Sequence, residues 1–141
     1  MSLARYLVDT SALLRLARDE AIGQLWAEPR DAGLLAVCPV TELELLYTAR
    51  SRRERDVMLD KLRSTFTWVV MPDRVFDHAA QTQAALTSRG LHRSAGPVDL
   101  LVAAAAQLHD LTLLHYDRDF EQVSEVTGQP RAWIAAPGSL P

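Results

Sequence analysis

Four acidic residues follow apolar segments of the sequence in a repeated way. Asp9 comes directly after "RYLV" and Asp117 directly after "LTLLHY", whereas Glu42 lies in "PVTELELL" and Asp99 in "GPVDLLVAAAA", each near the start of an expected helix. No lysine lies near any of the four. Carboxylates that crowd together without cationic partners repel one another and raise each other's pKa, so such a cluster is stable when a cation sits among them. The spacing therefore predicts an acidic metal site.

Each of these acids also has a simpler interpretation as a helix cap. Acidic side chains accept hydrogen bonds from the free N–H groups of a first helical turn and oppose the helix dipole, which stabilises a helix by about 0.3–1 kcal/mol. A cap explains each acid separately. In open parallel sheets, however, ligands bind outside the carboxyl ends of the strands. All four acids fall at that edge of the expected sheet, which favours the metal site.

The residue types indicate a hard divalent cation. Mg²⁺ and Mn²⁺ take oxygen ligands and retain several waters, whereas Zn²⁺ prefers histidine and thiolate ligands at spacings that this sequence lacks. The single cysteine, Cys38, lies in the apolar segment "LLAVCPV" and is interpreted as a buried hydrophobic residue. His115, beside Asp117, is interpreted as a core residue or as support for that acid. An open magnesium site suits phosphoryl chemistry, because the metal lowers the pKa of water and orients the phosphate.

The elements that must position these acids are short buried strands alternating with helices. Four apolar segments and a weaker fifth predict strands at 5–8, 34–37, 67–71, 111–116 and 132–135. They are apolar throughout rather than alternating, as in a parallel sheet covered on both faces. Helical patterns lie between them, at 11–27 with a break near Gly23, at 41–65, at 73–89, from Gly96-Pro97 onward, and briefly after Asp117. The expected fold is α/β, a three-layer α/β/α sandwich around a parallel sheet of four to five strands.

Length and composition agree with one globular domain. The 141 residues are 48% hydrophobic and 23% charged, and we expect a single domain over 1–135 followed by a flexible tail at 136–141. One cysteine permits no internal disulfide, and no segment resembles a signal peptide or a membrane span, so a cytoplasmic location is expected. The net charge of −3 argues weakly against a nucleic-acid partner, but bound cations would offset the acidic pocket.

Four segments in this order resemble the PIN-domain ribonucleases, most closely the VapC toxins of bacterial toxin–antitoxin pairs. The segments are "LVDTSALL", "TELEL", "GPVDLLVAAAA" and "LLHYDRDF", and the resemblance covers nearly the whole chain. It implies a PIN-like fold and a Mg²⁺-dependent (or Mn²⁺-dependent) endoribonuclease that inhibits translation or growth by cleaving tRNA, rRNA or mRNA. The alternative is a catalytically inactive PIN-like module that binds RNA or protein. The presence of all four principal acids counts against that alternative.

The resemblance also implies a role for each acid. Asp9, Glu42, Asp99 and Asp117 match the four catalytic acids of the family in that order. Asp9, Asp99 and Asp117 would hold one or two metal ions, while Glu42 would ligate or deprotonate a water. Hydroxide would then attack the RNA phosphodiester in line and leave 3′-hydroxyl and 5′-phosphate ends. Glu44 is two residues from Glu42 and so on a different helix face, and it is left out of the predicted site.

Three further residues have auxiliary roles in this interpretation. Asp119 looks like the additional acid that some members of the family carry. Thr10 or Ser11 matches a hydroxyl that orders the first acid or a metal-bound water, although an equally compatible role is to cap the first helix.

Two basic segments are candidates for binding the RNA backbone. "ARSRRERD" contains Arg50 and Arg53, and "RGLHRSAGP" contains Arg89, His92 and Arg93 just before an acid of the predicted site. Phosphate contacts of this kind weaken with salt. The first segment also contains interleaved acids, so a solvated helix face explains it equally well. The sequence contains no recognisable motif for reading RNA bases.

The resemblance predicts protein partners as well. A cognate VapB-type antitoxin would wrap the helices near 11–27 and 41–65 and block the acidic pocket, and a homodimer or a toxin–antitoxin hetero-oligomer is expected. No membrane partner is expected. Nucleotide-binding loops of the GxGxxG or GK[ST] kind are absent from the sequence, so a nucleotide-dependent enzyme is disfavoured.

Overall fold

The predicted strands form one sheet in which all five run parallel. The computed structural model describes residues 3–141. The strands are β1 (Tyr6–Val8), β2 (Leu35–Val37), β3 (Thr67–Trp68), β4 (Thr112–His115) and β5 (Arg131–Trp133). Their order across the sheet is β3-β2-β1-β4-β5. The chain therefore builds outward from β1 in two directions, and the crevice outside the carboxyl ends of β1 and β4 is where such sheets bind ligands.

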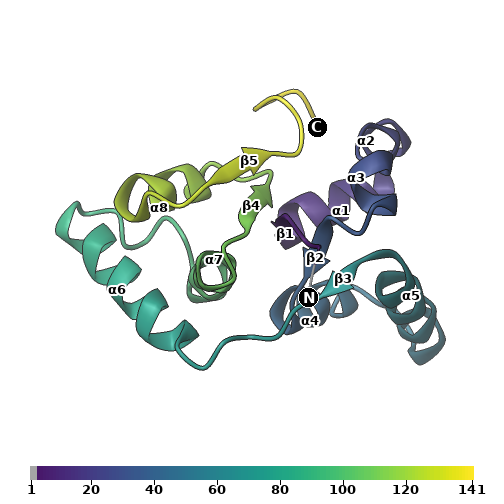
Figure 1. Ribbon diagram of the computed structural model, residues 1–141, viewed down its shortest axis with the longest axis horizontal. Helices are drawn as coiled ribbons and strands as arrows, with labels where there is room; N and C mark the ends of the chain where they lie inside the picture. Colours follow the sequence, from purple (N-terminus) through teal and green to yellow (C-terminus); the bar gives the residue numbers. More distant parts are fainter. Residues whose placement is uncertain (1–2) are drawn as a thin grey trace.

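Helices cover both faces of this sheet. They are α1 (Thr10–Arg18), α2 (Glu20–Leu25), α3 (Ala27–Asp31), α4 (Pro39–Leu46), α5 (Arg52–Thr65), α6 (Val75–Ser88), α7 (Pro97–Leu108) and α8 (Asp119–Thr127). Figure 1 shows α6, α7 and α8 on one side of the strands and α1 to α5 on the other. The predicted three-layer α/β/α sandwich is confirmed. In the part of the chain that the structure describes, no helix has both the length and the apolar character to cross a membrane.

The continuous apolar character of the strands follows from this layering. Successive strand residues point to opposite faces, so Leu7 packs into the cluster under α6, α7 and α8, while Val8 packs into the cluster under α1, α4 and α5. In β4, Leu113 packs into the first of these clusters and Leu114 into the second. On α7 the buried alanines allow the helix to lie close to the sheet. This close packing fixes where the start of α7 lies relative to the strand ends.

Two of the predicted helices are divided in the structure. The pattern at 11–27 breaks at Asp19, whose side chain accepts hydrogen bonds from the N–H groups of Ala21 and Ile22 and so starts α2. Gly23 lies inside α2, and the predicted break there is wrong. The pattern at 41–65 is also interrupted, because Ser51 caps a new helix, α5. Capping side chains, not glycine, set these boundaries.

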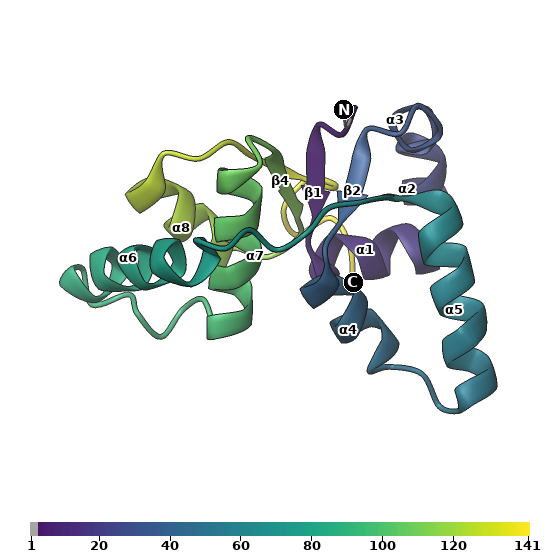
Figure 2. The same cartoon turned by 60° about the horizontal axis from the view of Figure 1, so that its bottom comes forward.

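The last residues fold back onto the domain. The N–H of Leu140 donates to the Tyr116 hydroxyl over 2.8 Å, and its side chain packs against the cluster under α1. A turn joins Ser139 to Ala136. One leucine and one backbone hydrogen bond thus attach the segment beside the end of β4, and the flexibility of the tail at 136–141 stays a prediction. Figure 2 shows that α1 and α7 both approach this end of the sheet.

Candidate metal-binding active site

Asp9 lies at the junction of β1 and α1, where one of its carboxylate oxygens caps the helix and the other has no partner in the described chain. Its Oδ2 caps α1 by accepting hydrogen bonds from the Ser11 N–H (2.9 Å) and the Ser11 hydroxyl (2.7 Å). Its Oδ1 is buried and has no hydrogen-bond partner in the described chain, and the residue is 3% exposed. A buried carboxylate oxygen without a partner is costly unless something else binds it.

The other acids lie close enough to act on Asp9 electrostatically. Burial is the main cause that raises the pKa of Asp9 to about 6, and the charges of Asp99 and Glu44 raise it further. Burial likewise raises the pKa of Asp99, to which Asp117, Glu44 and Asp119 add. Acids from the starts of α1 and α7, from α4 and from the β4–α8 junction therefore share one region. The sheet brings together side chains that lie more than 100 residues apart.

Local hydrogen bonds hold Asp99 and Asp117 in place. Asp99 is the third residue of α7, and its Oδ2 accepts from the Gly96 N–H over 3.1 Å. Asp117 follows β4, and its Oδ1 accepts from the Asp119 N–H over 3.0 Å. Each acid thus uses one oxygen for the local turn, as Asp9 does, and the other remains for a ligand. Burial and the charge of Asp117 raise the pKa of Asp119, which places Asp119 beside the principal acids.

His115 supports Asp117 from inside the sheet. The imidazole is fully buried, its Nδ1 accepts from the Asp117 N–H over 3.1 Å, and its Nε2 lies 3.1 Å from Glu121 Oε2. An accepting Nδ1 requires the neutral tautomer with the proton on Nε2. Burial lowers the pKa of His115, in agreement with that neutral form. The interpretation of His115 as support for the acid, and not as a metal ligand, is consistent with these contacts.

The structure groups Glu44, not Glu42, with the other acids. Glu42 forms an ion pair with Arg63 of α5, with Nη2 and Oε1 3.1 Å apart. Glu44 accepts a hydrogen bond from the Thr10 hydroxyl over 2.7 Å, and its charge raises the pKa of Asp9 and Asp99. This geometry favours Glu44 over the predicted Glu42 as the second acid of the site.

The burial of one residue of α4 shows which face of this helix turns inward. Thr41 is fully buried on the inner face of α4, and residues three apart on a helix share a face. Glu44 is three residues after Thr41, whereas Glu42 is adjacent to it and turned away by about 100°. Because α4 begins with a proline and a valine, its sequence does not show which residue is the first to face the sheet.

The two hydroxyls after Asp9 act on different acids. Ser11 donates to Asp9 and also accepts from the Tyr116 N–H over 2.9 Å, so one hydroxyl joins the β1–α1 junction to the β4–α8 junction. Thr10 donates to Glu44. The cap of α1 is Asp9 itself. Of the two hydroxyls, Ser11 is the one that contacts the first acid, Asp9.

The donor set fits a hard divalent cation. All candidate ligands are carboxylate oxygens, one of which, Asp9 Oδ1, is buried without a partner. Within residues 3–141, no three acidic, histidine or cysteine side chains form a group that could hold a metal ion by itself. Mg²⁺ does not require one, since it is commonly held by one or two carboxylates together with waters and substrate phosphates. Asp9, Asp99 and Asp117 are the residues that would hold it.

The basic residues proposed to bind RNA lie around the start of α5, at the end of α6 and in the loop before α7. Arg50 forms an exposed ion pair with Glu54, and Arg53 is exposed near the start of α5. His92 and Arg93 are exposed in the loop before α7, whose first turn carries Asp99. Arg89 forms an exposed ion pair with Glu125 of α8. Their RNA contacts stay predictions.

Metal affinity and stability are expected to depend on pH in opposite ways. The pKa of Asp9 is about 6 in the folded protein and 3.8 in a free side chain. As the pH falls, the folded state therefore binds a proton at a higher pH than the unfolded chain does. Without metal, the contribution of Asp9 to stability is therefore expected to rise as the pH falls from about 7 through 6 toward 3.8. Mn²⁺ competes with the same proton, so its affinity is expected to fall by about tenfold for each pH unit below 6. Titration calorimetry and thermal melts in EDTA measure the two effects, and a Mn²⁺ affinity independent of pH would contradict the site.

A parallel α/β sheet with a group of acids at its central crevice defines the class of protein. The PIN-domain family model matches residues 6–126. The chain belongs to the PIN-domain family.

Named relatives and solved structures agree with this assignment. Ribonuclease VapC21 of Mycobacterium tuberculosis is 40% identical over 135 residues, which cover 96% of this chain and 97% of the relative. Ribonuclease VapC18 of the same organism is 36% identical over 137 residues, with 96% and 98% covered. The crystal structure of DNA-bound VapBC from Salmonella typhimurium superposes with a TM-score of 0.77 at 17% identity, covering 94% of this chain and 99% of that one. At that identity the likeness shows a shared fold.

Proposed function

We propose that this protein is a Mg²⁺-dependent endoribonuclease, the toxin of a type II toxin–antitoxin pair, which slows translation or growth by hydrolysing RNA. The observation that carries the proposal is the unpartnered Oδ1 of buried Asp9. The charges of Asp99 and Glu44 act on Asp9, and the charge of Asp117 acts in turn on Asp99. Support comes from relatives of up to 40% identity that are named ribonucleases. A degenerate binding module would have no reason to keep a costly buried charge.

Each acid of the proposed site would have its own role in the reaction. Asp9, Asp99 and Asp117 would hold the divalent cation, which when bound supplies polarisation of the phosphate and a lower pKa for water. Glu44, held by Thr10, is placed to accept a proton from the attacking water at a carboxylate oxygen. Asp119 adds negative charge beside Asp117 and stiffens its loop. In-line attack on the phosphodiester would leave 3′-hydroxyl and 5′-phosphate ends.

Removal of the metal is the direct test of this function. A fluorescently labelled single-stranded RNA is expected to be cleaved with Mg²⁺ or Mn²⁺ and to remain intact with EDTA, because the acids alone repel the phosphodiester. Sequencing of the product ends checks for 5′-phosphates. Equal cleavage with and without EDTA would rule out the metal-dependent mechanism, and binding of RNA with no cleavage under any metal would favour the inactive module.

An antitoxin is proposed to dock in an apolar groove on the α1 side of the sheet. The groove has a volume of about 260 Å³, with Leu16 and Ala17 of α1, Leu45 of α4 and Met58 of α5 among its lining residues, and Lys61 also lines it. Amphipathic helices bind grooves of this kind through their apolar face. The structural neighbours include VapBC complexes from Salmonella typhimurium and Mycobacterium tuberculosis. The predicted wrapping of helices near 11–27 and 41–65 corresponds to this groove.

A charge placed in the groove tests this docking. Ala17 is exposed in α1 and lines the groove, so Ala17→Arg is expected to prevent copurification with the polypeptide encoded beside this chain's gene. Ala84→Arg, at an exposed position of α6 on the other side of the sheet, is the matched control and should copurify normally. RNA cleavage should survive both changes. Undiminished copurification of Ala17→Arg would place the antitoxin elsewhere.

A further inference from the structure

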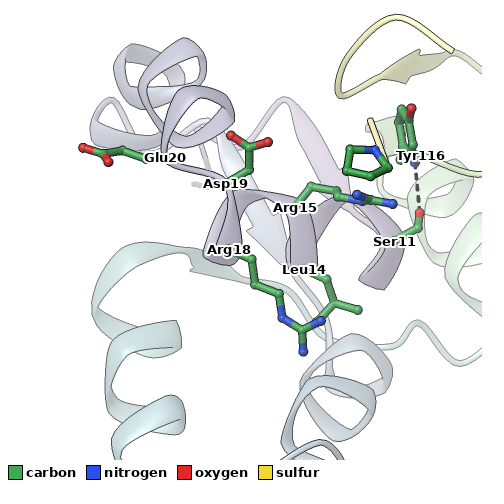
Figure 3. A pocket seen from close by; sticks show the side chains of 8 residues that line it. Ser11, Leu14, Arg15, Arg18, Asp19, Glu20 and Tyr116 are labelled. Carbon is green, nitrogen blue, oxygen red and sulfur yellow. Dashed lines mark hydrogen bonds between the residues drawn. The ribbon is translucent and has the colours of Figure 1, made fainter. Parts of the chain in front are cut away.

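A second cleft adjoins the acidic site along α1. Its volume is about 660 Å³, and it is lined mainly by the residues from Ser11 to Glu20 that face outward, together with Tyr116 and Pro141. Figure 3 shows the cleft and the hydrogen bond between Ser11 and Tyr116. Because Ser11 also holds Asp9, the cleft and the acidic site share one wall.

Arg15 occupies the part of this cleft nearest the acids. It lies four residues after Ser11 and therefore on the same face of α1. Its guanidinium carbon stands 5.0 Å from the centroid of the Tyr116 ring, and Figure 3 shows the side chain reaching toward that ring. Tyr116 is itself fixed, since its N–H donates to Ser11, its hydroxyl accepts from Leu140, and its ring meets the edge of Trp133 at 5.7 Å.

The guanidinium of Arg15 keeps its N–H groups available. Among residues 3–141, Arg15 forms no ion pair, in contrast to Arg63, which is occupied by Glu42. A guanidinium stacked on an aromatic face retains its in-plane donors, which match a phosphate bidentately. The nearest acid on the helix, Asp19, is engaged in capping α2. A preorganised guanidinium beside a site that cleaves phosphodiesters is suited to bind the substrate RNA.

We propose that Arg15, supported by Tyr116, binds a backbone phosphate of the substrate RNA next to the phosphodiester that the acids cleave. The inference rests on the proposed function and adds a specific substrate contact to it. Four helical residues advance about 6 Å, so Arg15 lies about one nucleotide from Ser11 and Asp9. An acidic peptide would also suit a guanidinium, but the relatives of this chain are named ribonucleases, so a phosphodiester is the anion expected at this site.

Salt-dependent RNA binding tests the contact. Arg15→Gln is expected to weaken binding of a short labelled single-stranded RNA by about tenfold in EDTA, measured by fluorescence anisotropy at low salt. The slope of log affinity against log salt should fall by about 0.7, the value for one phosphate on a single strand. Arg15→Lys keeps the charge but loses the planar guanidinium that stacks on Tyr116, so this variant should retain the salt slope and part of the RNA affinity. Arg5→Gln, at an exposed position at the opposite edge of the sheet, is the control and should match wild type.

Kinetics and metal binding separate this contact from the acidic site. In Mg²⁺, Arg15→Gln should raise KM by about tenfold and change kcat little, because a remote phosphate contact is made equally in ground and transition states. Its Mn²⁺ affinity and its melting temperature should equal those of wild type. An Arg15→Gln protein with wild-type RNA affinity and salt slope overturns the proposal, as does one that loses only the copurifying polypeptide. Wild-type protein that binds Mn²⁺ but neither binds nor cleaves RNA overturns the proposed function as well.

Discussion

Asp9→Asn is expected to lower the RNA cleavage rate at saturating Mg²⁺ by at least about 10³-fold. Asn has the shape of Asp, and its side-chain oxygen can still accept the Ser11 N–H that caps α1. Its amide nitrogen would then occupy the position of the unpartnered Oδ1, where it can neither ligate a cation nor carry charge. The rate is measured with labelled RNA, and Mn²⁺ affinity should fall in parallel.

A second capping aspartate provides the control. Asp19 caps α2 by accepting from two backbone N–H groups, whereas Asp9 caps α1 by accepting from the N–H and the hydroxyl of Ser11. Asp19→Asn should keep kcat within about twofold at saturating RNA, because an Asn cap costs little. An Asp9→Asn enzyme that cleaves RNA at the wild-type rate would refute the metal site.

Stability should change in the opposite direction from activity. A pKa near 6 at Asp9 means that the charged carboxylate destabilises the metal-free fold at neutral pH, by about 3 kcal/mol as an upper bound. The neutral Asn removes that charge, so metal-free Asp9→Asn should melt at a temperature at least as high as wild type. A lower melting temperature would show that the carboxylate serves the fold and not the cation.

Glu44→Gln and Glu42→Gln are expected to differ sharply, although the residues are two positions apart. Glu44→Gln should reduce cleavage by about 10²-fold or more, because it removes the charge that Thr10 holds among Asp9 and Asp99. Glu42→Gln breaks a pair with an exposed arginine, which is worth at most about 1 kcal/mol. It should therefore keep activity within about threefold.

Each of these two variants serves as the matched control for the other. Both replace a glutamate of the same short helix by its amide, so effects on helix propensity cancel. Mn²⁺ titrations should show weaker binding for Glu44→Gln alone. Loss of activity in Glu42→Gln with normal activity in Glu44→Gln would restore the assignment made from the sequence.

The fold class, and the meeting of three acids at one edge of the sheet, were predictable from local patterns in the chain. Uniformly apolar strands such as "RYLV" are typical of a sheet buried on both faces, and the structure confirms a parallel sheet with helices on each side. Asp9, Asp99 and Asp117 were also predictable, because a parallel sheet brings its strand ends and helix starts to one edge. These features depend on local pattern and on one general rule of topology.

Only the tertiary structure decided between Glu42 and Glu44 and placed Arg15 on Tyr116. The choice of glutamate depends on the rotation of α4 about its axis, which is set by packing against the sheet and by the ion pair with Arg63. The Arg15 contact joins residues 101 positions apart, and Leu140 completes it from the end of the chain. Neither helix rotation nor a contact between distant segments leaves a periodic signal in the sequence, because both arise only when the layers pack.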